Sequence, residues 1–291
     1  MTQTIENQYL RITAAEYGAE LQSIYDLERN QEVLWQGDPA FWARRSPVLF
    51  PNVGKHYNNI YRISGKEYLS RQHGFARDMV FSCIEKTDCT ITYLLKSDEE
   101  TLKVYPFAFD LKITYTLQDR DLSVKWEIST PGYDTIYFTI GGHPAFNVPV
   151  LPGTLQQDYS LYFNKKDKLE YFLIYPGSGV ADTKTKHTLE LNDGTCSIDP
   201  HMFDNDALII DEQITKTGIR YPDGSPYLEM SCEGFPCFGI WNSPGAPFVC
   251  LEPWSGRCDD YGYDGELSDR PFINKVIPGE LFEASYKLHI F

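Results

Sequence analysis

The Gly-Gly-His-Pro segment around His143 places an imidazole in a setting suited to proton transfer. An apolar run at residues 135–140 comes before it and predicts a strand. The two glycines favour a tight turn or a close approach to a neighbouring group, and Pro144 restricts the backbone of His143 to extended or turn conformations. A histidine delivered by the end of a strand suits acid-base chemistry near neutral pH. A histidine satisfied by backbone hydrogen bonds is the simpler alternative for one such residue alone.

Two other segments share this design, because each ends a strand-like run and sets an ionisable side chain among glycine, proline and aromatic residues. One carries His73 and Arg77, and the other carries Glu252 directly before Pro253. A glutamate at the end of an apolar strand is expected to be partly desolvated, which raises its pKa and makes it a better base. An edge-strand glutamate in solvent is the alternative. Together the histidines and the glutamate fit either an acid-base set or a metal site, although their spacing matches no metal motif.

Composition indicates the elements that must position these groups. The chain has 291 residues, of which 42% are hydrophobic and 14% aromatic, enough for a large core or for two smaller ones. Apolar and polar residues alternate with period two in runs such as 111–117, 122–128 and 282–290, and turn residues separate the runs. We therefore predict an all-β fold, a large antiparallel β-sandwich with few short helices, one of them near residues 39–43.

Charge and cysteine usage exclude several classes of partner. The formal net charge of −15 disfavours nucleic acid and anionic membranes as partners. The 7 cysteines form no CxxC pair and no zinc framework, which fits a reducing cytosol. The first residues have no signal-peptide pattern, and no apolar run approaches the roughly 20 residues of a membrane helix. A cytoplasmic protein is expected.

Five segments in the same order along the chain resemble the aldose 1-epimerase (galactose mutarotase) family, and within it the LacX-like branch. They are Phe50-Pro51-Asn52-Val53-Gly54-Lys55, His73-Gly74-Phe75-Ala76-Arg77, Gly142-His143-Pro144-Ala145-Phe146-Asn147, Phe203-Asp204-Asn205-Asp206-Ala207-Leu208 and Leu251-Glu252-Pro253-Trp254. Any one of them is a weak signal, and five in order are a strong one. The resemblance implies a galactose mutarotase-like supersandwich that spans residues 1–291 as a single domain.

The resemblance also implies a reaction, the interconversion of the α and β anomers of a hexose. His143 would be the general acid that protonates the ring oxygen, and Glu252 the base that takes the proton of the anomeric hydroxyl. The ring would open to the aldehyde and close again on the other face. The expected partner is a small-molecule sugar, and neither a metal nor another cofactor is needed.

Further sugar-binding residues are implied by the same resemblance: His73, Arg77, Asp206, Lys55, Asn52 and Trp254. Asp204 is close enough to be confused with Asp206, and Trp254 would either stack on the sugar or pack beneath Glu252. Lys55 departs from the family pattern, which often has arginine here. Because lysine offers a point charge and no planar fork, the identity of the sugar stays open.

Three alternatives remain. A hexose 6-phosphate would be favoured if Arg44 and Arg45 join Arg77 in a phosphate pocket, although the two are also simple surface cations. A sugar-binding protein without turnover would keep the cleft alone. A lyase or hydrolase is more remote, because glycoside hydrolysis usually needs two carboxylates at one bond. The oligomeric state stays open between a monomer and a homodimer.

Overall fold

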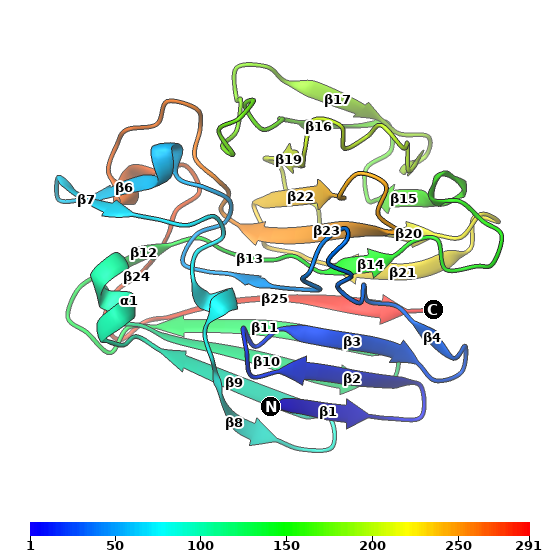
Figure 1. The fold of residues 1–291 in the computed structure, drawn as a ribbon, viewed down its shortest axis with the longest axis horizontal. Coiled ribbons are helices and arrows are strands. Elements are labelled where there is room, and N and C mark those ends of the chain that lie inside the picture. The colour runs from blue at the N-terminus through cyan, green and yellow to red at the C-terminus, as the bar shows by residue number, and fades with distance from the viewer.

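The computed structural model describes all 291 residues, and it confirms the predicted antiparallel all-β architecture. The largest sheet contains β8 (Ser82–Lys86), β9 (Thr90–Lys96), β10 (Asp110–Gln118), β11 (Asp121–Ser129), β15 (Ser160–Phe163), β18 (Thr195–Ser197), β20 (Lys216–Arg220), β21 (Pro226–Ser231) and β25 (Leu281–Ile290). The order across it is β18-β15-β20-β21-β25-β11-β10-β9-β8, running from the right of Figure 1 to the bottom. Buried residues alternate with more exposed ones along β10 and β11, as the sequence pattern predicts.

A second sheet covers part of the first. It consists of β1 (Thr2–Glu6), β2 (Leu10–Ala15), β3 (Leu21–Asp26) and β4 (Gln31–Glu32), in that order. The hydroxyl of Tyr93 donates a 2.9 Å hydrogen bond to the carbonyl of Ala14, and that of Tyr115 donates one of 2.7 Å to Ala19. These bonds satisfy two buried phenols at the junction of the two layers.

The third sheet carries the candidate site and lies above β25 in Figure 1. Its strands are β5 (Val48–Leu49), β13 (Ile140–Gly142), β14 (Ala145–Asn147), β19 (Leu208–Ile210), β22 (Cys237–Trp241) and β23 (Phe248–Ser255). The order is β19-β22-β23-β13-β5, and β14 also pairs with β23. Every residue of β23 is buried. A Cβ on Gly142 would lie 3.2 Å from the Tyr286 hydroxyl of β25, so this sheet packs closely on the nine-stranded one.

Three two-stranded sheets and a few helical turns complete the chain. The pairs are β6 (Ile60–Ile63) with β7 (Lys66–Leu69), β12 (Ile136–Phe138) with β24 (Asn274–Val276), and β16 (Lys168–Tyr171) with β17 (His187–Glu190). The α-helix α1 spans Glu99–Val104, and 3-10 turns span Tyr57–Asn59, Ala76–Asp78, Gln156–Asp158 and Leu267–Asp269. The side chain of Asp98 caps α1 by accepting from the Thr101 N–H at 2.8 Å. The helices of this chain are too short or too polar to cross a membrane.

One local prediction is wrong, and of the two roles predicted for the glycine pair before His143 the structure shows the second, a close approach to neighbouring groups. Residues 39–43 form a turn and no helix, because the Asp38 carbonyl accepts from both Phe41 and Trp42 and the pattern does not continue. The glycine pair before His143 belongs to β13 and makes no turn. Gly141 and Gly142 serve close packing instead, since a Cβ on Gly141 would lie 2.5 Å from the indole of Trp254.

Candidate active site

His143 and Glu252 meet in the middle of the third sheet. β13 pairs with β23 at Trp254, β14 pairs with β23 at Cys250, and His143 lies in the break between β13 and β14. Glu252 is midway between those two positions of β23 and so lies opposite the break. Nε2 of His143 is 3.4 Å from Oε2 of Glu252. Two segments that are far apart in the sequence thus bring an imidazole and a carboxyl together.

Burial disfavours the charged form of both groups. Glu252 is 1% exposed and His143 is 7% exposed. Burial raises the pKa of the Glu252 carboxyl well above its ordinary value. Burial also lowers the pKa of His143 to about 3, and the positive charge of Arg77 adds to this shift. The raised pKa of Glu252 agrees with the sequence-based expectation, whereas the imidazole is moved away from neutrality.

Aromatic rings enclose the imidazole. Trp42 stacks on it with ring centroids 4.8 Å apart and an angle of 30°. Trp241 of β22 meets it edge-on at 5.5 Å, and His73 lies at 5.6 Å with an angle of 77°. These contacts fix the orientation of the His143 ring and exclude water from two of its sides.

His73 is held by a reciprocal pair of hydrogen bonds with Gly54. The His73 N–H donates to the Gly54 carbonyl at 2.7 Å, and the Gly54 N–H donates to Nδ1 of His73 at 3.1 Å. Because Nδ1 accepts, the neutral ring carries its proton on Nε2. Burial, with the nearby charge of His143 next, lowers the pKa of His73 well below its ordinary value. His73 therefore offers Nε2–H as a neutral donor, and the Gln72 amide at 3.3 Å can accept that proton when its oxygen faces the ring.

Two guanidinium groups form one end of the site. Arg77 donates to the Gln72 carbonyl at 2.7 Å, makes no ion pair, and leaves its buried Nε without a hydrogen-bond partner in the protein. Arg44 pairs with Asp78 at 2.7 Å. Burial, followed by the charge of Arg44, lowers the pKa of Arg77 to about 10. Arg45 points elsewhere and donates to the Gln22 side chain at 2.9 Å, so the Arg44-Arg45 pair does not act as a unit.

One of the two candidate aspartates reaches the site. Asp206 lines the cavity, and its charge is among the causes that raise the pKa of Glu252. Asp204 pairs with His201 at 2.9 Å and does not line the cavity. Of the two aspartates, Asp206 is thus the one whose position allows contact with a ligand in this cavity.

Trp254 packs closely beneath the site. A Cβ on Gly239 would lie 2.2 Å from its ring, closer still than the 2.5 Å of the one on Gly141. The indole therefore needs glycine on both neighbouring strands, and it contributes a flat wall next to Glu252.

Asn52 and Lys55 are not among the residues that line this cavity, and their expected sugar contacts stay predictions. The Asn52 amide donates to the carbonyls of Gly54 at 2.8 Å and Arg71 at 3.0 Å. It braces the loop that holds His73. A Cβ on Gly179 would lie 2.6 Å from the Lys55 side chain, which is packed there against the neighbouring loop.

The residues of the candidate site line a cavity of about 380 Å³, which lies in the size range of small-molecule sites. Its lining is mixed and includes cationic, carboxyl and tryptophan side chains. The lining residues are Trp42, Arg44, Val53, Gly54, Gln72, His73, Arg77, His143, Ile174, Gly179, Asp206, Ala207, Ile209, Trp241, Glu252, Trp254 and Cys258.

Comparison with known proteins identifies the family of this chain. The family model described as aldose 1-epimerase matches residues 1–195. The chain belongs to the aldose 1-epimerase family. It is 30% identical to the chromosomal protein LacX of Lactococcus lactis subsp. lactis over 298 residues, covering 100% of this chain and 99% of that protein.

Two solved structures agree with this family assignment. A galactose mutarotase related enzyme from Lactobacillus acidophilus is 31% identical with a TM-score of 0.94, over 100% of this chain and 97% of that one. A galactose mutarotase-like protein from Lactobacillus casei is 29% identical with a TM-score of 0.91, over 100% of both chains. The epimerase fold is therefore conserved from end to end in these relatives.

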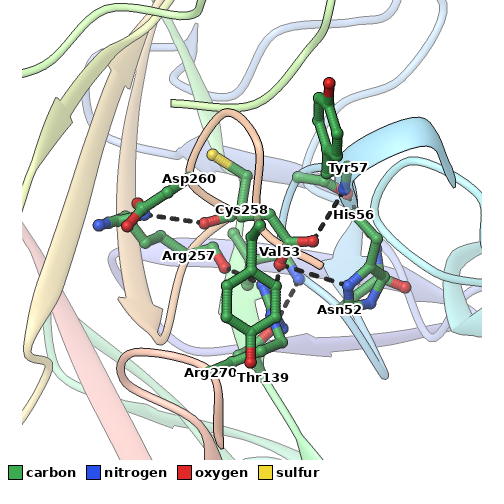
Figure 2. A network of polar contacts seen from close by, with 12 residues as sticks. Asn52, Val53, His56, Tyr57, Thr139, Arg257, Cys258, Asp260 and Arg270 are labelled. Carbon is green, nitrogen blue, oxygen red and sulfur yellow. Dashed lines mark hydrogen bonds and ion pairs between the residues drawn. The ribbon is translucent and has the colours of Figure 1, made fainter. Parts of the chain in front are cut away.

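A buried network of charges supports one wall of this epimerase-family site (Figure 2). Arg270 pairs with Asp259 at 2.5 Å and donates to the carbonyl of Arg257 at 2.8 Å. Asp259 accepts from the Tyr57 N–H at 2.8 Å, and its own N–H donates to the carbonyl of Lys55 at 3.0 Å. The network holds the 53–57 loop in place, and Gly54 of this loop orients His73 through their two hydrogen bonds.

Sequence reasoning missed four side chains at the site: Trp42, Trp241, Gln72 and Cys258. The position of Trp241 at the site follows from strand pairing. Trp241 lies opposite Cys250, and Cys250 stands two residues before Glu252. Trp42 lies in an irregular loop, and no local pattern in the sequence identifies it. The metal site weighed from the sequence consists of the two histidines and Glu252 and does not include Cys250, whereas in the structure the donor atoms of His143, Cys250 and Glu252 all lie within 4.8 Å of one another.

Proposed function

We propose that the protein is a cofactor-independent aldose 1-epimerase that interconverts the α and β anomers of a hexose. The buried pair of His143 and Glu252, 3.4 Å apart on the wall of a sugar-sized cavity, carries this proposal. An anomer exchange needs one group that removes a proton and one that supplies a proton at the two ends of the same O–C–O unit. A carboxyl and an imidazole at this separation meet that need.

The proton inventory of the pair is sufficient for the whole cycle. At rest the carboxyl of Glu252 holds the proton and His143 is neutral. Transfer of that proton to Nε2 of His143 creates a carboxylate and an imidazolium. Glu252 then accepts the proton of the anomeric hydroxyl while His143 protonates the ring oxygen, and the bond from C1 to the ring oxygen breaks. The aldehyde form is reached with both side chains back in their resting states.

Ring closure reverses these steps on the other face of the aldehyde. After rotation about C1–C2, Glu252 returns a proton to the carbonyl oxygen while His143 takes the proton of the attacking hydroxyl. The proton then crosses back from the imidazolium to the carboxylate. No proton has to be exchanged with solvent, which suits a site enclosed by Trp42 and Trp241.

The surrounding groups supply orientation. Nε2–H of His73 is a neutral donor for a sugar oxygen, Asp206 is an acceptor for hydroxyls, and Arg77 is a donor at the opposite end. Donors and acceptors on different sides of one ring hold it in a single pose, which is the requirement for efficient proton transfer.

Polarimetry with freshly dissolved α-glucose and α-galactose tests the proposal. The expected result is faster mutarotation with the parent protein, and a loss of at least about 10²-fold in Glu252→Gln and His143→Ala. Glu190→Gln, on exposed β17, is the matched control and is expected to keep the parent rate. Equal rates for the parent and both site variants would overturn the proposal. Calorimetric binding of the sugar without rate enhancement would instead identify a sugar-binding protein.

A phosphorylated hexose is the second candidate, and one observation favours it. Arg77 is a half-buried cation without a carboxylate partner, and Arg44 lies at the same end of the cavity. An unpaired cation away from water is costly, and an anionic substituent of the ligand would neutralise it. Competition by glucose 6-phosphate at lower concentration than glucose would support this candidate, and equal competition by both would remove it.

A further inference from the structure

We propose that His143, Cys250 and Glu252 form a binding site for a thiophilic divalent cation of the Zn²⁺ and Cd²⁺ class, and that the bound ion blocks the acid-base pair. The binding itself is independent of the proposed function. Only the inhibition rests on it, because inhibition requires that the pair turns over a sugar.

Strand geometry brings the three donors together. Cys250 and Glu252 are alternate residues of β23, so their side chains leave the same face of the strand. His143 projects toward that face from the break between β13 and β14, with Nε2 3.4 Å from Oε2 of Glu252. All three donor atoms lie within 4.8 Å of one another. Zn–N, Zn–O and Zn–S bonds of about 2.0 to 2.3 Å place tetrahedral donors roughly 3.3 to 3.8 Å apart, so a shift of about 1 Å completes the site.

The donor set also has the chemistry of such a site. Imidazole, thiolate and carboxylate are the three ligand types that bind Zn²⁺. His143 and Glu252 line the cavity whereas Cys250 lies behind them, so the fourth coordination position faces the cavity and is free for water. A thiolate and a carboxylate together balance a divalent cation. This matters because all three residues are buried and an uncompensated charge would be costly there.

Part of the donor set lacks a partner in the protein. Oε2 of Glu252 makes no hydrogen bond, and neither does Nδ1, the second ring nitrogen of His143. The Cys250 thiol is free and fully buried beside this pair. Because a metal ion binds cysteine as the thiolate, binding releases the thiol proton.

The experiment uses the full chain after treatment with a chelator. Cd²⁺ is titrated while the ultraviolet thiolate-to-metal charge-transfer band is recorded, and Zn²⁺ is titrated while mutarotation is followed. We expect one Cd²⁺ site per chain with this band, inhibition by Zn²⁺, and relief of both by excess galactose. In Cys250→Ala and Cys250→Ser we expect turnover to persist, the band to disappear, and the inhibitory Zn²⁺ concentration to rise at least about tenfold, since even second-shell changes cost this much affinity.

Cys232→Ala is the matched control, because Cys232 is equally buried and lies outside the three-donor group. It is expected to keep the band and the inhibition. A band and an inhibition constant unchanged in both Cys250 variants would overturn the proposal, as would a parent protein that shows neither. If the parent shows no mutarotation at all, the proposed function fails and the Cd²⁺ band alone still decides the metal site.

Discussion

Nε2 of His143 and Oε2 of Glu252 lie 3.4 Å apart, and burial raises the pKa of the carboxyl and lowers that of the imidazole. The two shifts have opposite signs because desolvation disfavours the charged form of each group. Burial therefore favours the neutral form of both members of the pair. The charged forms of both groups, which ring opening requires, are thus disfavoured at rest. The buried pair should therefore affect the free energy of unfolding as well as the rate of mutarotation.

Glu252→Gln should become more stable than the parent protein as the pH rises. The pKa of Glu252 is raised in the folded state, so above the unfolded-state pKa the unfolded chain releases a proton that the folded protein keeps. The free energy of unfolding of the parent then falls with pH until the folded-state pKa is passed. Glutamine mimics the neutral acid and lacks this term, worth at most about 1.4 kcal/mol per pH unit.

Chemical denaturation of both proteins from about pH 5 to about pH 8 measures this difference. Glu190→Gln, with an exposed side chain, should follow the parent at every pH. A constant difference between Glu252→Gln and the parent across this range would contradict a protonated carboxyl in the folded protein.

Substitution of Arg77 should separate the two candidate substrates. If the ligand carries a phosphate, Arg77→Gln should reduce kcat/KM for glucose 6-phosphate by about 10- to 150-fold, the equivalent of one or more charge-assisted hydrogen bonds, and affect glucose less. Steady-state rates with both sugars give the comparison. Arg45→Gln is the control, since Arg45 turns away to Gln22. An equal effect of Arg77→Gln on both sugars would indicate that Arg77 binds a hydroxyl group that the two sugars share.

Removal of the ring that stacks on His143 should impair turnover. Trp42 lies face to face with the imidazole at 4.8 Å, and such pairs contribute about 0.5 to 1.5 kcal/mol beyond buried area. We expect Trp42→Ala to lose roughly two- to tenfold in kcat, and Trp42→Phe to lose less, because an aromatic face remains. Initial mutarotation rates at saturating sugar decide the point. Tyr133→Ala, with its ring in solvent, serves as the control.

The buried ion pair of Asp259 with Arg270 should be important for stability and for His73. Asp259→Asn leaves Arg270 without its carboxylate inside the protein, and loss of one partner of a buried pair costs about 3 to 5 kcal/mol. The 53–57 loop should loosen as well, and KM should rise because Gly54 no longer holds His73 firmly. Urea denaturation and sugar titration measure the two effects.

Asp204→Asn is the reference for the Asp259 experiment, because its pair with His201 is exposed to solvent. Exposed pairs contribute about 0 to 1 kcal/mol. Similar losses of stability in the two variants would argue against a structural role for the buried network.

Local patterns predict strands well in this chain and predict irregular segments poorly. β10 and β11 follow from period two alone, since one face of each strand meets the core. The only α-helix was missed: α1 is six residues long and ends next to an apolar corner, so its hydrophobic periodicity is too short to be read. Its signal was the cap, with Asp98 three residues before Thr101.

The sequence by itself determined the residue types that can do chemistry and the order in which they occur. The sequence alone indicates His143, Glu252, His73 and Arg77, and it leaves Asp206 and Asp204 as alternatives, because each stands in a segment that carries the family resemblance. Only the tertiary structure decided which of them converge and in what state. Pairing of β13 and β14 with β23 sets the distance between the acid and the base.

Tertiary packing also decided the protonation states, since burial depends on what covers a group. Trp42 comes from a distant loop and Trp241 from a neighbouring strand, and together they take His143 out of water. Asn52 and Lys55 carry the right chemistry and are not among the residues that line the cavity, since the Asn52 amide is bound to backbone carbonyls and the Lys55 side chain lies against Gly179. The sequence specifies the chemical type of each side chain. The distances between the site residues and the degree to which they are shielded from water are set only when strands from distant parts of the chain pack together.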